Sequence, residues 1–372
     1  MTTNYNIISC DGGGIRGLIP AMLLNDLETN PPSGFSAGIL SKVNLFAGTS
    51  TGGIIALGLA CGISTSSVVD LYDSTSDCSS IFTAYTPPSS GTSTAIARLR
   101  LSSPQATSSF LCDLFPDLCY VEYTNTGLYK LLSDTLSTQS QTLLSGLAKS
   151  VLVATFRISN TSNDPWGPLA LTNLPNSDFS DVAVIDAAMC TSAAPLYFPP
   201  YGLPPANPTM WCCDGGVFAN NPSAFVLANV LASQVLQQEQ KQVSNVMMLS
   251  LGTGVTTDYV PSSDVNPVED WGIGAWLNPV ATAPEPEYPL MAAMFDGQSE
   301  IADFETANFL GANYRRANPT LAQTINLDDC SAIGNANDCT GTASNTLVCV
   351  AQNYINSSAW SGIKQWVYTN FV

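Results

Sequence analysis

Residues 43–52 read Val-Asn-Leu-Phe-Ala-Gly-Thr-Ser-Thr-Gly, and this stretch decides the fold. Its apolar first half, Val43–Ala47, is typical of a buried strand in a parallel sheet. The small residues of Thr51–Cys61, closed near Gly62, predict a helix packed close to that sheet. Between them stands Ser50 in the pattern G-x-S-x-G, which exposes a serine hydroxyl on a sharp strand-to-helix turn. We therefore predict that Ser50 is a nucleophile, with an incidental turn serine as the plainer interpretation.

The chain contains no histidine. A serine hydroxyl is a weak nucleophile until a neighbouring base takes its proton. Histidine is the usual base in serine hydrolases. If Ser50 reacts, another side chain must therefore accept its proton, and a carboxylate is the natural candidate.

A glycine-rich loop lies near the N-terminus. The apolar run Tyr5–Cys10 predicts a strand that leads into Asp11–Gly17, Asp-Gly-Gly-Gly-Ile-Arg-Gly, and Leu18–Glu28 follows with helical spacing. Such a turn points backbone N–H groups at a phosphate or at the oxyanion of an acyl-transfer intermediate. The G-x-x-x-x-G-K-[ST] pattern is absent and G-x-G-x-x-G fits only loosely. We favour the oxyanion interpretation, and a nucleotide-dependent enzyme remains the alternative.

The third signal is Asp214–Gly216, Asp-Gly-Gly, followed by Asn-Asn-Pro at the predicted start of another helix. Its plainer interpretation is an aspartate that caps a turn. The chain holds two Asp-Gly-Gly sites, at Asp11 and Asp214, so one must be chosen as the base. Asp11 belongs to the loop whose amides are expected to face the oxyanion, and we therefore favour Asp214.

In this order the three motifs resemble those of the patatin-like phospholipases, D-G-G-G-x-R-G, then G-x-S-x-G, then D-G-G/A. Here they occupy Asp11–Gly17, Gly48–Gly52 and Asp214–Gly216. Two further stretches also look similar to the family, Ala187–Phe198 and Met248–Gly254. The resemblance weakens after about residue 320.

The resemblance implies a three-layer α/β fold whose mostly parallel central sheet has helices on both faces. It implies that Ser50 and Asp214 form a Ser-Asp dyad. This dyad would cleave carboxylic esters of phospholipids, glycolipids or simple acyl esters through an acyl-enzyme. No cofactor and no metal are expected. The predicted oxyanion hole comprises Gly12, Gly13, Gly14, Arg16 and Thr51.

Composition excludes several other classes. The 372 residues are 45% hydrophobic and 11% charged, too apolar for a disordered chain. A net charge of −18 with only eleven Lys plus Arg argues against nucleic-acid binding. The same charge disfavours anionic membranes. We expect an acyl lipid substrate at a neutral or zwitterionic membrane or micelle surface. The oligomeric state stays open.

No targeting segment is evident, and the strongly apolar stretch Gly52–Ile63 is far shorter than the ~20 residues of a membrane span. We therefore expect no transmembrane segment and a soluble, cytoplasmic protein, with secretion by another route left open. Of the eleven cysteines, three in apolar surroundings are predicted core residues: Cys10, Cys61 and Cys190. Three in polar stretches can form disulfides in an oxidising compartment: Cys330, Cys339 and Cys349.

We expect residues 1–372 to form a single elaborated domain. Irregular insertions are predicted near 79–109 and 255–290, and the segment from about 320 has no clear counterpart in the family pattern. A flap over the acyl site is one use for 255–290, and a static surface loop is the plainer one. A catalytically silent storage or interaction protein with the same fold remains the main functional alternative.

Overall fold

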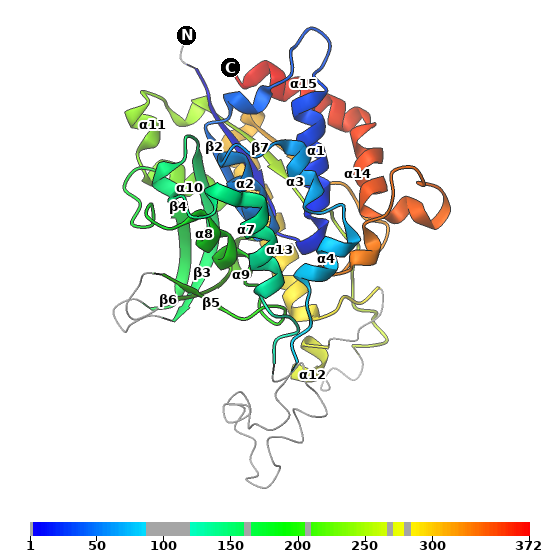
Figure 1. The fold of residues 1–372 in the computed structure, drawn as a ribbon. Coiled ribbons are helices and arrows are strands. Elements are labelled where there is room, and N and C mark those ends of the chain that lie inside the picture. Colours follow the sequence, from blue (N-terminus) through cyan, green and yellow to red (C-terminus); the bar gives the residue numbers. More distant parts are fainter. Residues whose placement is uncertain (1–2, 87–119, 160–164, 205–209, 266–270, 279–283) are drawn as a thin grey trace.

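The structure is a computed structural model. This structure describes residues 3–86, 120–159, 165–204, 210–265, 271–278 and 284–372 (Figure 1). From residue 87 onward, the insertion predicted near 79–109 lies outside the described residues.

An eight-stranded sheet runs through the middle of the molecule in the order β5-β6-β3-β2-β1-β7-β8, with β4 paired to β3 (Figure 1). The run β3-β2-β1-β7-β8 is parallel, whereas β4 and β6 pair with β3, and β5 with β6, in antiparallel sense. The predicted α/β architecture is confirmed, with a sheet that is mixed on one side. The strands are β1 (Tyr5–Cys10), β2 (Leu45–Thr49), β3 (Ser150–Ser159), β4 (Gly167–Thr172), β5 (Tyr201–Leu203), β6 (Met210–Asp214), β7 (Val246–Leu251) and β8 (Tyr314–Ala317).

Strand β3 is long enough to carry two neighbours along one edge. Its first half, Ser150–Ala154, pairs with β2, and its second half, from Thr155, pairs with β6. Strand β4 pairs with residues 152–157, which overlap both halves, so β4 occupies the opposite edge. Strands β2 and β6 therefore meet end to end along β3, with their carboxyl ends facing each other.

Helices cover both faces of the sheet (Figure 1). They are α1 (Leu18–Thr29), α2 (Thr51–Ala60), α3 (Thr65–Asp70), α4 (Thr75–Ile81), α7 (Thr126–Leu136), α8 (Val184–Thr191), α9 (Gly216–Ala219), α10 (Ser223–Ala232), α11 (Val235–Gln238), α12 (Ile273–Trp276), α13 (Pro289–Leu310), α14 (Leu347–Ile355) and α15 (Ser358–Asn370). The hydrophobic core on one face includes α1, α2, α8, α14 and α15, and that on the other includes α10 and α11.

The central strands are apolar on both faces, as a sheet between two helical layers requires. Along β1, Ile8 and Cys10 belong to one hydrophobic core, whereas Tyr5 and Ile7 belong to the other. This alternation follows from the two-residue period of a strand. It explains why the central strands read as continuous apolar runs.

The predicted strand–turn–helix around Ser50 is present as β2 and α2. The strand was placed two residues too early, because Gly48 and Thr49 still pair with β3. Their neighbour in space, the strand predicted at Tyr5–Cys10, is confirmed at those bounds.

The C-terminal helices pack against α1 and complete one helical layer. Trp360 is fully buried, and its indole N–H donates to the Asp26 carboxylate at 2.6 Å. Lys364 also forms an ion pair with Asp26, at 2.8 Å. The hydroxyl of Tyr368 donates to the Leu27 carbonyl at 2.8 Å. The segment beyond residue 320 thus shares a core with the N-terminal half.

The six cysteines that the sequence analysis singled out fall into the two predicted groups, and one disulfide recruits a cysteine outside them. Cys10 and Cys190 are buried free thiols, and Cys61 is partly buried. Cys339 forms a disulfide with Cys349. A second disulfide joins Cys330 to Cys78, so it ties the C-terminal segment to α4.

Within the ranges that the structure describes, no helix is both long enough and apolar enough to cross a membrane.

Candidate active site

Ser50 occupies a strained turn between β2 and α2. Its backbone has φ 54° and ψ −125°, a conformation that costs a non-glycine residue free energy. A Cβ on Gly48 would lie 2.1 Å from the backbone of Gly52, so the turn can close only with glycine at position 48. A Cβ on Gly52 would lie 2.2 Å from the Cys10 carbonyl oxygen, so glycine there lets α2 approach β1. The N–H of Ser50 donates to the Thr191 hydroxyl at 2.9 Å, and that hydroxyl donates to the Ala154 carbonyl at 2.6 Å. Thr191 thereby anchors the turn to β3.

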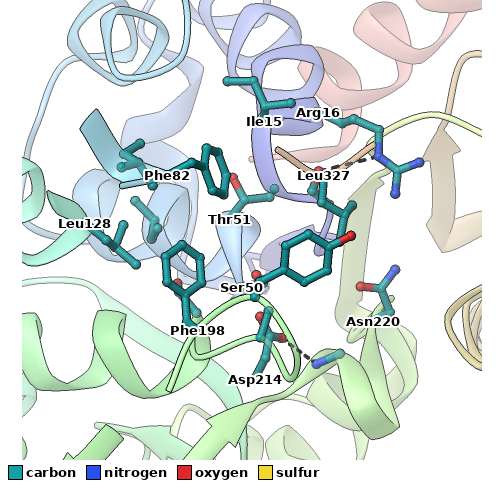
Figure 2. A pocket seen from close by; sticks show the side chains of 18 of the residues that line it. Ile15, Arg16, Ser50, Thr51, Phe82, Leu128, Phe198, Asp214, Asn220 and Leu327 are labelled. Carbon is teal, nitrogen blue, oxygen red and sulfur yellow. Dashed lines mark hydrogen bonds between the residues drawn. The ribbon is translucent and has the colours of Figure 1, made fainter. Parts of the chain in front are cut away.

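Asp214 ends β6 and faces Ser50 (Figure 2). Its carboxylate is only 4% exposed and accepts a hydrogen bond from the Ser50 hydroxyl. It also accepts one from the Gly216 N–H at 2.7 Å. Burial raises the pKa of Asp214 to about 7, against the lowering effect of these two donors. The side chain can therefore hold or release a proton near neutral pH.

The other Asp-Gly-Gly aspartate lies in a different environment. The Arg316 guanidinium donates to both carboxylate oxygens of Asp11, at 3.2 and 2.5 Å. Burial raises the pKa of Asp11, and Arg316 opposes that rise. Asp11 is thus held in a buried ion pair with β8, and it does not line the cleft around Ser50.

In the Gly-Gly-Gly run of the glycine loop, one backbone amide is hydrogen-bonded within the fold and two others lie at the cleft beside Ser50. The Gly12 N–H donates to the Asn220 carbonyl at 2.9 Å, so this predicted oxyanion donor is already occupied. Within the described chain, the N–H groups of Gly13, Gly14 and Thr51 have no hydrogen-bond partner. These three residues line the cleft beside Ser50. Three donors are therefore available to an anion at this point.

Side-chain packing explains why the loop needs glycine. A Cβ on Gly13 would lie 2.3 Å from the Thr253 hydroxyl oxygen, which is held in place by donating to the Gly12 carbonyl at 2.8 Å. Gly14 has φ 55°, in the left-handed region, and a Cβ there would meet the Leu327 carbonyl at 2.2 Å. That carbonyl accepts the Ile15 N–H at 2.8 Å.

Arg16 stands farther from the chemistry than predicted. Figure 2 shows its side chain extending away from Ser50, with Nε 3.5 Å from the Gly13 carbonyl oxygen. Its charge interacts with Asp296 and Asp258 rather than with the Ser50–Asp214 pair.

The cleft above Ser50 is lined mainly by apolar side chains (Figure 2). We call it the acyl cleft. Its apolar lining comprises Ile15, Ile54, Tyr72, Ile81, Phe82, Leu128, Ala194, Tyr197, Phe198, Phe295 and Leu327. Such a lining accommodates a hydrocarbon chain beside the serine. In the part of the chain that the structure describes, no group of three or more acidic or cysteine side chains is placed to hold a metal ion.

Several residues of the site were not identified from sequence. Thr191 and Thr253 lie in the stretches Ala187–Phe198 and Met248–Gly254, which resemble the family but carry no obvious chemistry. Arg316 and Leu327 had no local signal, because both act through partners more than 300 residues away in sequence.

The family model described as Patatin-like phospholipase matches residues 8–226, more than half of the chain. The chain belongs to the patatin-like phospholipase family. Membership supports a hydrolase that acts on lipids.

Relatives of this patatin-like chain come from plants and bacteria. Patatin-like protein 2 of Arabidopsis thaliana is 27% identical in an alignment of 332 residues that covers 84% of this chain and 74% of that protein. The cGAMP-activated phospholipase of Vibrio cholerae is 28% identical over 348 residues, 89% of this chain and 87% of that protein. Among solved structures, VipD from Legionella pneumophila aligns with a TM-score of 0.42 at 11% identity, over 99% of this chain and 67% of that one.

The two aspartates are expected to differ in their effect on stability. Because the pKa of Asp214 is raised, wild type loses stability as pH rises from about 4 through about 7. Asp214→Asn removes this loss, so its midpoint of thermal unfolding relative to wild type should rise between pH 5 and pH 8. The upper limit is ~4 kcal/mol for a shift of about three units. Asp11→Asn leaves Arg316 buried without its partner and should cost ~3–5 kcal/mol at pH 8. Equal effects of the two substitutions at pH 8 would contradict this assignment.

Proposed function

We propose that this patatin-like protein is a lipid acyl hydrolase that cleaves carboxylic esters through a Ser50–Asp214 dyad. One observation carries the proposal. In a chain without histidine, the hydroxyl of a strained turn serine donates to a buried carboxylate whose pKa is about 7. The apolar lining of the acyl cleft supports a fatty acyl chain as the acid portion of the ester.

The reaction proceeds in two halves. Asp214 accepts the hydroxyl proton while Ser50 Oγ bonds to the carbonyl carbon of the ester, whose π electrons move to the oxygen. The resulting oxyanion is stabilised by free backbone N–H groups, from Gly13 and Gly14 on one side and Thr51 on the other. When the intermediate collapses, the ester C–O bond breaks and the leaving alcohol takes the proton from Asp214.

The acyl-enzyme is then hydrolysed by the same groups. Water gives a proton to Asp214 and adds its oxygen to the acyl carbon. The second intermediate collapses, the fatty acid leaves, and the proton returns to Ser50. A carboxylate of ordinary pKa is a poor base for a hydroxyl, and a base is most effective when its pKa lies near the working pH. The buried setting of Asp214 supports this role.

Two alternatives have distinct signatures. A catalytically silent storage protein would leave Ser50 unreactive, although the free amides and the open cleft argue for turnover. A nucleotide-dependent enzyme would place phosphates on the glycine loop. The occupied Gly12 amide and the position of the loop against Ser50 favour an oxyanion instead.

Substitution of the dyad tests the function directly. Ser50→Ala and Asp214→Asn should each abolish hydrolysis of a soluble short-chain p-nitrophenyl ester and of phospholipid micelles, while circular dichroism stays unchanged. A fluorophosphonate probe should label wild type at Ser50, as found by peptide mass spectrometry. Label on another serine, or full activity in Asp214→Asn, would refute the dyad.

The pH dependence follows from the raised pKa of Asp214. The base must be ionised, so kcat/KM for the soluble ester should rise with pH and reach half its plateau near pH 7. Products should be quantified by chromatography, because the colour of a released phenol itself changes with pH. A rising limb centred near pH 4, the ordinary value for an aspartate, would show that Asp214 is not the base.

The glycine loop gives a test of oxyanion stabilisation. Gly13→Ala forces a Cβ against Thr253 and should displace the Gly13 amide from the cleft. Loss of one such donor costs ~100- to 1,000-fold in kcat with little change in KM, because the charge develops only in the transition state. Gly58→Ala is the matched control, since its Cβ would contact only Val68 at 3.7 Å. Unchanged kcat in folded Gly13→Ala would remove Gly13 from the oxyanion hole.

A further inference from the structure

A second cavity adjoins the acyl cleft, and we call it the side pocket. Five residues line both cavities: Arg16, Ala194, Tyr197, Phe295 and Leu327. On its far side, Thr256, Asp258 and Pro286–Tyr288 come from the proline-rich insertion 255–290. Part of that insertion therefore walls a cavity that borders the candidate active site.

The side pocket is more acidic than the acyl cleft. Asp214 and Arg16 are the charged residues among those that line the acyl cleft. The side pocket adds three carboxylates, from Asp258, Glu287 and Asp296. With Arg16 as the cation among its described lining residues, the side pocket carries an excess of negative charge next to a mainly apolar cleft.

These carboxylates differ in their surroundings: Asp258 and Glu287 are half-buried, Asp296 is exposed, and Glu287 accepts a hydrogen bond from the Asn326 side chain. Burial raises the pKa of Glu287 and of Asp296, and Arg16 pulls that of Asp296 back down. Asp258 accepts a hydrogen bond from the Thr324 hydroxyl. Within the described ranges, Arg16 forms no ion pair closer than 4.0 Å. A ligand with one positive and one negative group would compensate both kinds of charge.

Aromatic rings complete the wall of the side pocket. Tyr197 and Tyr288 pack edge to face, with ring centroids 6.3 Å apart. Phe295 and Met291 from α13 lie beside them in the lining. Aromatic faces together with carboxylates are the usual environment for an organic ammonium group, including a quaternary one.

We propose that the side pocket binds the ammonium group of a zwitterionic phospholipid head group, choline or ethanolamine. This inference rests on the proposed function, because it places the scissile ester at Ser50. Ser50 and Arg16 line the acyl cleft, and Arg16 also lines the side pocket together with the three carboxylates. A zwitterionic phospholipid has the same order, with ester, then phosphate, then ammonium. The anionic phosphate meets Arg16, and the ammonium meets the three carboxylates and the tyrosines.

The charges also discriminate against other lipids. An anionic head group without an amine would place its negative charge beside Asp258, Glu287 and Asp296 without compensation. A galactolipid or a diacylglycerol would leave Arg16 and the carboxylates without a charged partner. The net charge of −18 acts in the same direction against anionic lipid surfaces.

Binding of phosphocholine tests the inference without turnover. Calorimetry with folded Ser50→Ala at pH 8 should show phosphocholine binding tighter than glycerol 3-phosphate, which has the phosphate but no ammonium. Adding Asp296→Asn should weaken phosphocholine binding about 10-fold, the cost of one charge-assisted contact. Glu300→Gln is the matched control, because it removes the same charge one turn later on α13 at an exposed position outside the lining. It should leave the affinity unchanged.

A lipid panel gives the second readout. Phosphatidylcholine, phosphatidylethanolamine, phosphatidylglycerol and diacylglycerol with the same acyl chains are compared in micelles of a neutral detergent. Wild type should cleave the first two about 10-fold faster in kcat/KM than the others, and Asp296→Asn or Asp258→Asn should reduce that ratio. Glu300→Gln should retain it, which separates the side pocket from a general effect of net charge.

The outcomes distinguish the two proposals. Equal affinity for phosphocholine and glycerol 3-phosphate, or faster cleavage of phosphatidylglycerol or diacylglycerol, overturns the head-group site. If wild type then still hydrolyses the soluble ester and Ser50→Ala does not, the acyl hydrolase stands alone. If no ester is cleaved but phosphocholine binding still depends on Asp296, the side pocket stands and the proposed function falls.

Discussion

The end-to-end meeting of β2 and β6 along one edge of β3 is the constraint on which the site depends. Because β2 is parallel to β3 and β6 is antiparallel to it, the two carboxyl ends face each other at residues 154 and 155 of β3. Ser50 follows one end, and Asp214 is the other. In a purely parallel sheet the carboxyl ends of the strands lie side by side. At this junction the carboxyl ends of β2 and β6 instead point toward each other.

This junction also accounts for the unusual state of both residues. Asp214 lies at the end of a strand inside the sheet, where few water molecules can reach it, and the raised pKa follows from that burial. Ser50 lies where the chain must turn at once into α2, and its positive φ follows from that turn. Both conditions cost folding free energy. Thr191 and the Gly216 amide offset part of the cost by hydrogen bonding at the junction.

The two Asp-Gly-Gly motifs show that identical local sequences can serve different ends. Asp11 follows β1 and reaches Arg316 of β8, whereas Asp214 ends β6 and reaches Ser50. Asp11 is paired with an arginine and stabilises the fold through a buried ion pair. Asp214 accepts a hydrogen bond from the Ser50 hydroxyl and has no cationic partner in the described structure, so burial leaves its pKa near 7. The difference lies in the strand that each aspartate faces, and not in the motif.

Sequence alone determined the helices, strands and site residues that depend on neighbouring residues in the chain. The apolar runs, the glycines of the elbow and of the N-terminal loop, and the lack of histidine predicted β1, β2, α1, α2, Ser50 and a carboxylate partner. Tertiary structure decided what depends on distant contacts. It made β6 antiparallel to β3, paired the Gly12 amide with Asn220 and placed Arg16 in the lining of the side pocket. It also brought Leu327 to the acyl cleft and part of the insertion 255–290 to the side pocket. The direction of a strand, the partner of a backbone amide and the lining of a pocket all depend on packing between segments that are far apart in the chain. Local residue patterns therefore cannot predict them.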